Sequence, residues 1–123
     1  MLFVILPFED NLTDIIISDL SLHYFTEQKT FEILDEIKRV LNPNGLLFFR
    51  VNSINDVNYG AREGKEIESH LYETGDGRYK RFFDEKDIAT FFANWEKLYI
   101  HEEKLGRYGA EKVLWRGALK VNK

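Results

Sequence analysis

The fold is decided by two stretches of sequence, Asp14-Ile-Ile-Ile-Ser18 and Leu34-Asp-Glu-Ile-Lys-Arg-Val-Leu-Asn-Pro-Asn-Gly-Leu46, the second of which continues to Val51. The first stretch is a short apolar run without alternation, typical of a strand that helices cover on both faces. The second stretch completes a helix, turns, and enters another apolar run. A strand, a helix and a strand within about forty residues predict a βαβ unit with a right-handed crossover.

The helix of this unit is predicted over Thr26–Leu41. Thr26 is a good N-cap, and apolar side chains recur at spacings of three and four along one stripe. The stripe consists of Phe31, Leu34, Ile37 and Leu41. The run Asn42-Pro-Asn-Gly45 ends the helix, because proline cannot continue it and Asn44 or Gly45 accepts a positive φ.

Further elements are predicted on both sides of the unit. Met1–Leu6 indicates a buried strand, and residues 65–72 a short helix. Thr74-Gly-Asp-Gly77 predicts a hairpin turn, and Asp84 caps a second helix with Asp87 completing a capping box. The remaining strands, predicted as an antiparallel pair, are Lys97–Lys104 and Lys112–Val121. This order predicts an α/β sheet with a C-terminal antiparallel hairpin.

Composition narrows the function classes. The chain has 123 residues, 44% of them apolar, which predicts one folded domain over residues 1–123. There are 17 basic and 21 acidic residues, so no basic excess indicates nucleic-acid binding. The absence of cysteine excludes disulfides and thiolate chemistry and fits a cytoplasmic location. The apolar run Met1–Leu6 is too short for a signal segment or a membrane span, so no membrane partner is expected.

Three runs carry a resemblance to a known family. They are Leu6-Pro-Phe-Glu-Asp-Asn11, Thr13-Asp-Ile-Ile-Ile-Ser-Asp-Leu-Ser-Leu-His-Tyr24 and the helix and turn ending at Leu46. They resemble the middle of a class I S-adenosylmethionine-dependent methyltransferase. Thr13 and Asn44 depart from the family pattern at an aromatic and a glycine position. The resemblance implies a partial Rossmann-like methyltransferase sheet, comprising strands 3/4 to 7 of the family, in a single truncated domain.

The resemblance starts at the family's third strand. The glycine-rich turn and the acidic residue that bind the cofactor in this family precede that point, and nothing in this sequence matches them. Gly75 and Gly77, like Gly106 and Gly109, are interpreted as turn residues between strands. We therefore expect the cofactor, S-adenosylmethionine, to find only half of its site here, and the isolated chain to be inactive.

Cofactor contacts are implied by the resemblance at the ends of two strands. The implied residues are Leu6, Ser18, Asp19, Leu20 and His23. For Asp19, a purely local capping or turn role is the alternative. His23 and Tyr24 are candidates for a general base, since imidazole titrates near neutral pH; a histidine packed beneath the helix is the competing interpretation.

Acceptor contacts are expected at the next strand end and in the variable region after it. Arg50 ends a buried strand, where a charge needs a partner, so it either binds an anionic substrate or pairs with Asp19. The other substrate candidates are Asn52, Tyr59 and Arg81. His70 and His101 share no ligand spacing with other metal-binding residues, so no metal site is predicted.

Two main hypotheses follow. The first is the C-terminal portion of a methyltransferase acting on a small-molecule acceptor. The second is a non-catalytic interaction module, because the Asp14–Ser18 strand has an apolar edge with no neighbour from the missing strands. The Met1–Leu6 strand could pair with that edge in antiparallel fashion, or two chains could form a homodimer through it. A third reading is that the chain is a fragment of a longer enzyme.

Overall fold

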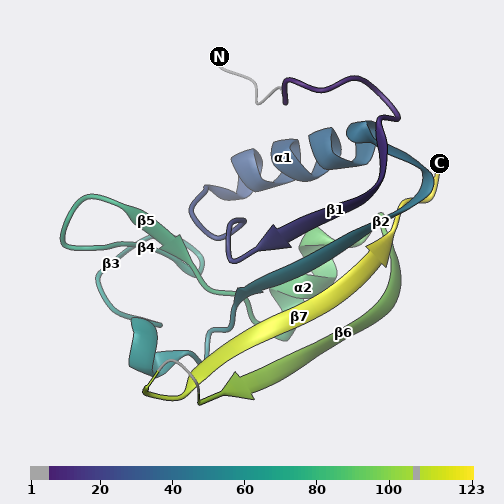
Figure 1. Ribbon diagram of the computed structural model, residues 1–123. Helices are drawn as coiled ribbons and strands as arrows, with labels where there is room; N and C mark the ends of the chain where they lie inside the picture. The colour runs from purple at the N-terminus through teal and green to yellow at the C-terminus, as the bar shows by residue number, and fades with distance from the viewer. Residues whose placement is uncertain (1–5, 107–108) are drawn as a thin grey trace.

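The computed structural model describes residues 6–106 and 109–123. Figure 1 shows a twisted sheet with helices beside it and a separate small group of strands. The elements are β1 (Thr13–Asp19), α1 (Glu27–Val40), β2 (Leu41–Asn52), the 3-10 turn η1 (Val57–Tyr59), β3 (Lys65–Glu68), β4 (Leu71–Glu73), β5 (Tyr79–Arg81), α2 (Glu85–Phe91), β6 (Glu96–Leu105) and β7 (Lys112–Lys120). The predicted α/β class is confirmed.

The main sheet has the strand order β1-β2-β7-β6. β1 pairs with β2 in parallel, and α1 connects them, so the predicted βαβ unit is confirmed. β7 pairs antiparallel with both β2 and β6, which confirms the predicted C-terminal hairpin. Because β1 and β2 are parallel, their carboxyl ends meet at one edge of the sheet.

Helix α1 forms for the reasons that its sequence indicates. The side chain of Thr26 accepts a hydrogen bond from the Lys29 amide at 3.3 Å, and Leu34 and Ile37 are buried. Near the start of β2, Asn44 has a φ of 67°, which confirms the predicted left-handed position. Neither this helix nor any other in the described residues is long and apolar enough to cross a membrane.

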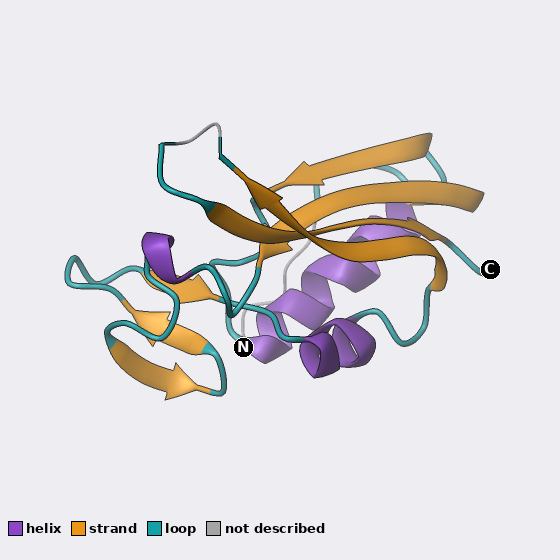
Figure 2. Ribbon diagram, turned by 90° about the horizontal axis from the view of Figure 1, so that it is seen from below, coloured by secondary structure: helices purple, strands orange, loops and turns teal. Residues whose placement is uncertain are grey.

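Both helices cover the same face of the sheet (Figure 2). On that face Leu47, Phe49 and Val51 are buried, and the Phe49 ring lies 4.6 Å from that of Phe92 between centroids. On the opposite face, Ile15 is 52% exposed and Ile17 is 74% exposed. The predicted two-sided burial of the Asp14–Ser18 run is therefore wrong, since only one face of β1 has a helix against it.

β1 is an edge strand of the described part of the sheet. The strand predicted over Met1–Leu6 lies outside the described residues, except for Leu6. The Leu6 amide donates a hydrogen bond to Glu36 Oε1 at 2.9 Å, which ties Leu6 to α1. A groove with Leu6 at one end therefore runs between β1 and α1.

The second sheet corrects one prediction. Residues 65–72 form β3 and the start of β4 in an antiparallel pair, not a short helix. The turn between them places His70 at a φ of 63°, which ends any helical run. The predicted Thr74–Gly77 turn is confirmed between β4 and β5, with the Gly77 amide 3.0 Å from the Thr74 oxygen. Asp84 is the N-cap of α2, and the predicted capping box with Asp87 is confirmed.

Candidate cofactor and acceptor site

The carboxyl ends of β1 and β2 form the candidate site, because ligands of open α/β sheets bind beyond such ends. Asp19 stands beside Arg50 in the parallel register. The Leu20 amide then donates to the Arg50 oxygen at 2.9 Å, so the loop after β1 begins against the end of β2. Leu20 holds a φ of 55°, a strained value for a branched side chain that fixes the direction of this loop.

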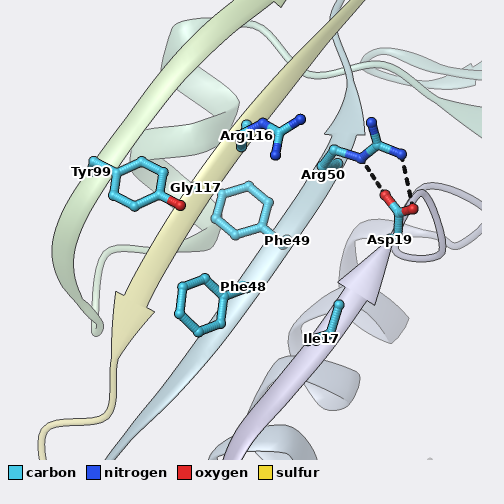
Figure 3. A pocket seen from close by; sticks show the side chains of 8 residues that line it. All are labelled: Ile17, Asp19, Phe48, Phe49, Arg50, Tyr99, Arg116 and Gly117. Carbon is cyan, nitrogen blue, oxygen red and sulfur yellow. Dashed lines mark hydrogen bonds and ion pairs between the residues drawn. The ribbon is translucent and has the colours of Figure 1, made fainter.

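Arg50 and Asp19 form an ion pair, which is one of the two roles that the sequence offered for Arg50. The guanidinium donates from Nε and from Nη2 to the two carboxylate oxygens, the second contact being 2.9 Å (Figure 3). The pair borders a pocket of about 380 Å³ on the helix-free face, between β1 and the β6–β7 hairpin. Phe48 and Tyr99 also line this pocket.

Leu6 and Ser18, two of the residues implied to contact the cofactor, line the groove between β1 and α1. Its volume is about 510 Å³, and most of its lining is apolar. The Ser18 hydroxyl lies 2.7 Å from that of Ser21, where either can be the donor. The groove therefore brings together Leu6, which precedes β1 in the chain, and Ser18, which lies near the end of β1.

S-adenosylmethionine fits this groove only in part. Apolar side chains such as Ile16 and Leu22 suit the adenine ring and the thioether chain. The ribose hydroxyls need an acidic partner, and no acidic residue lines the groove in the described part of the chain. Asp19 borders the other pocket and is bound to Arg50. The described residues therefore match part of the cofactor, and no chemical step is assigned through it.

His23 is 3% exposed and lies in the interior. Burial, reinforced by the charges of Lys80 and Lys112, lowers its pKa to about 3. The imidazole is therefore neutral at neutral pH and a weak proton acceptor. Its Nδ1 has no hydrogen-bond partner among the described residues. Tyr24 is 50% exposed, and its ring centroid is 4.4 Å from that of His23.

Asn52 belongs to a buried network that the sequence did not reveal. The ammonium group of Lys112 donates to Asp56 Oδ2 at 2.7 Å and to Asn52 Oδ1 at 3.1 Å. The other Asp56 oxygen accepts from the Val113 amide at 2.8 Å. Asn52 Nδ2 is buried without a partner in the described residues. In sequence, Lys112 looks like an ordinary charge at the start of a strand, so only the fold identifies it.

The two remaining acceptor candidates have different surroundings. Tyr59 lines a pocket of about 220 Å³ together with Lys80, and its hydroxyl donates to the Ala110 oxygen at 3.0 Å. Arg81 is 2% exposed. Its guanidinium pairs with Glu68 and donates to the Phe25 oxygen at 3.2 Å, which binds the second sheet to the loop after β1. Tyr59 is thus near the site edge, while Arg81 is engaged inside the protein.

One potential metal-binding cluster exists where the sequence predicted none. The ligand atoms of His70, Asp84 and Asp87 lie within 4.8 Å of one another. His70 Nδ1 is 2.5 Å from Asp87 Oδ2, and both carboxylates also cap α2. Asp84 and Asp87 follow His70 by 14 and 17 positions in the sequence. Sequence spacing alone therefore does not reveal the cluster. Its groups satisfy one another and the helix end.

Known proteins with similar sequences are methyltransferases. The family model "Methyltransferase domain" matches residues 3–49. The chain is 36% identical over 83 residues to the tRNA N(3)-methylcytidine methyltransferase Mettl2 of Drosophila melanogaster; the match covers 67% of this chain and 26% of that protein. The chain therefore spans about a quarter of this relative.

Solved structures share the fold. A S-adenosylmethionine-dependent methyltransferase from Methanosarcina mazei superposes with a TM-score of 0.75 at 18% identity, over 95% of this chain and 63% of that one. The 1,6-didemethyltoxoflavin-N1-methyltransferase of Burkholderia thailandensis, solved with S-adenosylhomocysteine, gives a TM-score of 0.69 at 17% identity, over 94% and 46%. The family model and the relative agree with the sequence runs, and the solved structures share the fold, so the chain is similar to class I S-adenosylmethionine-dependent methyltransferases.

Proposed function

We propose that the chain is the C-terminal portion of a S-adenosylmethionine-dependent methyltransferase with a small-molecule acceptor, and that it is inactive alone. The observation that carries the proposal is the meeting of the β1 and β2 ends beside a groove whose described lining is mostly apolar and includes no acidic partner for the ribose. A truncated single domain over residues 1–123 and a cytoplasmic location belong to the same proposal.

The proposed roles follow the two strand ends. Leu6, Ser18, Asp19, Leu20 and His23 would contact the cofactor from the β1 side. Arg50, Asn52, Tyr59 and Arg81 would contact or enclose the acceptor from the β2 side. Tyr24 is the better candidate for proton transfer, because it is half exposed, whereas His23 is buried and its lowered pKa makes the imidazole a weak proton acceptor. Methyl transfer otherwise requires mainly proximity and alignment.

Titration calorimetry tests the incomplete site. S-adenosylmethionine and S-adenosylhomocysteine are titrated separately into the isolated chain, and we expect no heat of binding at micromolar concentrations. A dissociation constant in the micromolar range would overturn the claim of an incomplete site. The variant Ser18→Val then locates the binding, because Ser18 lines the groove, with the exposed Lys86→Ala on α2 as its control.

The acceptor class needs a separate test, because the Drosophila relative is named for tRNA. The net charge of −4 favours a small molecule over a polyanion. Fluorescence polarisation with labelled tRNA is measured at 50 and 200 mM salt. We expect no binding at either concentration. Binding that weakens steeply with salt would replace the small molecule with RNA as the proposed acceptor.

A second candidate function is self-association through β1. Paired antiparallel about Ile16, two copies of β1 would set Ile15 of one chain opposite Ile17 of the other on the helix-free face. Asp14 would stand opposite Ser18, so no like charges would oppose one another. Such a pair would satisfy the free edge of the described sheet and cover its exposed isoleucines.

Sedimentation velocity at tens of micromolar tests this candidate. We expect a dimer for the native chain and a monomer for Ile17→Lys, because lysine on an exposed edge strand opposes pairing. Val57→Lys is the matched control, since Val57 is 54% exposed on η1, away from β1. A monomeric native chain, or equal dissociation by both variants, contradicts pairing through β1.

A further inference from the structure

A buried group of polar side chains lies at the end of β2 and beneath the second sheet. We call it the polar cluster; its members are His23, Asn52, Asp56, Lys80 and Lys112. His23, Asn52, Asp56 and Lys112 are between 0% and 7% exposed. Polar groups at this depth are normally fully hydrogen-bonded, so those that are not point to a missing partner.

Backbone pairing places His23 next to Asn52. The Arg81 amide donates to the His23 oxygen at 2.6 Å, and the Phe83 amide donates to the Asn52 oxygen at 2.8 Å. Arg81 and Phe83 are two positions apart on one extended segment, so the two accepting residues are roughly 7 Å apart along it. One extended segment thus holds the loop after β1 and the end of β2 at neighbouring positions.

The cluster contains two ammonium groups and the Asp56 carboxylate, and the Glu63 carboxylate lines the pocket beside Lys80. Lys112 is neutralised by Asp56, and its ammonium group lies 4.9 Å from the centre of the Tyr59 ring. The Lys80 ammonium group donates a hydrogen bond to the backbone carbonyl oxygen of Tyr59 at 2.8 Å, and this oxygen carries no charge. Burial and the charge of Lys112 lower the pKa of Lys80, against the weaker opposing pull of Asp56 and Glu63. An anion beside Lys80 would oppose this lowering of its pKa.

Two hydrogen-bonding atoms of the cluster have no partner in the described residues, His23 Nδ1 and Asn52 Nδ2. The Asn52 amide nitrogen can only donate, and a neutral imidazole donates from Nδ1 in one of its tautomers. Each buried donor left unpaired costs about 1–3 kcal/mol. Two unpaired donors beside an ammonium group match the oxygens of an anion.

We infer that the polar cluster binds one small oxyanion group, a carboxylate or a phosphate, with Asn52 Nδ2 and His23 Nδ1 donating to it and Lys80 supplying the charge. The inference rests on the proposed function, in which this group belongs to the methyl acceptor. Of the three binding residues, Lys80 lines a pocket of about 220 Å³, together with Tyr59 and Glu63. Its volume suits a small acceptor.

The test is a nuclear magnetic resonance titration of the full chain at constant ionic strength, maintained with sodium chloride. Acetate, inorganic phosphate and neutral acetamide are added separately. We expect the Asn52 side-chain amide, the His23 imidazole and the Lys80 ammonium signals to shift saturably with an anion and not with acetamide. The anion that saturates at the lower concentration identifies a carboxylate or a phosphate.

Lys80→Gln should weaken the anion's affinity at least tenfold, while Lys86→Gln on α2 should leave it unchanged, because Lys86 is exposed and outside the cluster. Circular dichroism confirms that each variant is folded. Non-saturable shifts, or shifts equal to those with acetamide, overturn the inference and leave a buried water as the partner of both donors. The titration needs no cofactor, so its outcome is independent of the calorimetry on S-adenosylmethionine.

Discussion

Arg50 and Asp19 stand side by side on neighbouring parallel strands, and the guanidinium of the first binds both carboxylate oxygens of the second. The pair lies on the face of the sheet that carries neither helix. A charge at the end of a buried strand needs a partner, and the parallel register supplies one from the adjacent strand. The pair therefore joins the ends of β1 and β2, where the candidate site begins.

Arg50→Gln should lower the free energy of unfolding by about 1 kcal/mol, because a two-point arginine–carboxylate contact exceeds an ordinary surface pair. The Arg50 side chain is 13% exposed. The matched control is Arg78→Gln, which breaks the pair with Asp76 where the arginine side chain is 83% exposed; its effect should stay within about 0.5 kcal/mol. Urea denaturation measures both. Equal effects would show that the sheet does not depend on the Arg50 contact.

Gly117 on β7 permits the close approach of the Phe49 ring. A Cβ at Gly117 would lie 2.5 Å from Phe49 Cε1 and 3.0 Å from Ile100 Cγ1. Gly117→Ala should therefore destabilise the protein by about 1–3 kcal/mol through overpacking. Gly75→Ala is the control, since nothing lies within 4 Å of its Cβ position. A neutral Gly117→Ala in urea denaturation would mean that Phe49 can turn away without loss.

The sequence predicted the elements whose signals are local. The Thr26 cap, the stripe through Leu34 and Ile37, and the left-handed Asn44 each depend on residues within one or two turns, and the structure contains all three. The Asp84–Asp87 capping box is local in the same sense. The ion pair of Arg50 was predicted for a different reason. Charged residues at the ends of buried strands are rarely unpaired, so Arg50 was expected to have an acidic partner.

The elements that were wrong depend on distant partners. Residues 65–72 contain good helix formers, yet Lys65 pairs across to Glu73 and the left-handed His70 makes the turn between the strands. Likewise, the apolar run Asp14–Ser18 indicates burial, while its exposure is set by which face the helices cover. Tertiary pairing outweighs local propensity in both cases.

The polar cluster lay beyond sequence reasoning for a similar cause. His23 and Asn52 were candidates because each follows a strand end. Lys112 is 60 residues from Asn52 and 56 from Asp56, and nothing in their spacing connects them. Only the antiparallel return of β7 beside β2 brings the ammonium group to both partners.

Arg81→Met should destabilise the second sheet, because it removes a buried guanidinium that pairs with Glu68 and donates to the Ser69 oxygen at 3.2 Å. We expect a loss of about 2–4 kcal/mol, since the partners lose their donor. Hydrogen exchange should accelerate first at the amides of β4 and β5. Lys65→Met on the exposed part of β3 is the control and should leave those amides protected. If the exchange rates of these amides are unchanged in Arg81→Met, the second sheet is stabilised mainly by its apolar residues and not by Arg81.

His23 should make the protein less stable as the pH falls below about 6.5. Burial, with Lys80 and Lys112 nearby, lowers its pKa to about 3 in the folded state, whereas the unfolded chain takes up a proton near the ordinary value of 6.5. The unfolded state then binds more protons, so stability rises with pH across this window, by at most about 1.4 kcal/mol per pH unit. His23→Gln removes this term.

Urea denaturation at intervals from pH 4 to 7.5 measures the difference between the native chain and His23→Gln. The native chain and the variant differ only at position 23, so the difference reports on His23. We expect the native chain to lose stability relative to the variant on acidification. A constant difference would mean that His23 titrates equally in the folded and unfolded states. A difference of the opposite sign would mean that the folded chain holds a protonated His23, and that Lys80 and Lys112 do not control its charge.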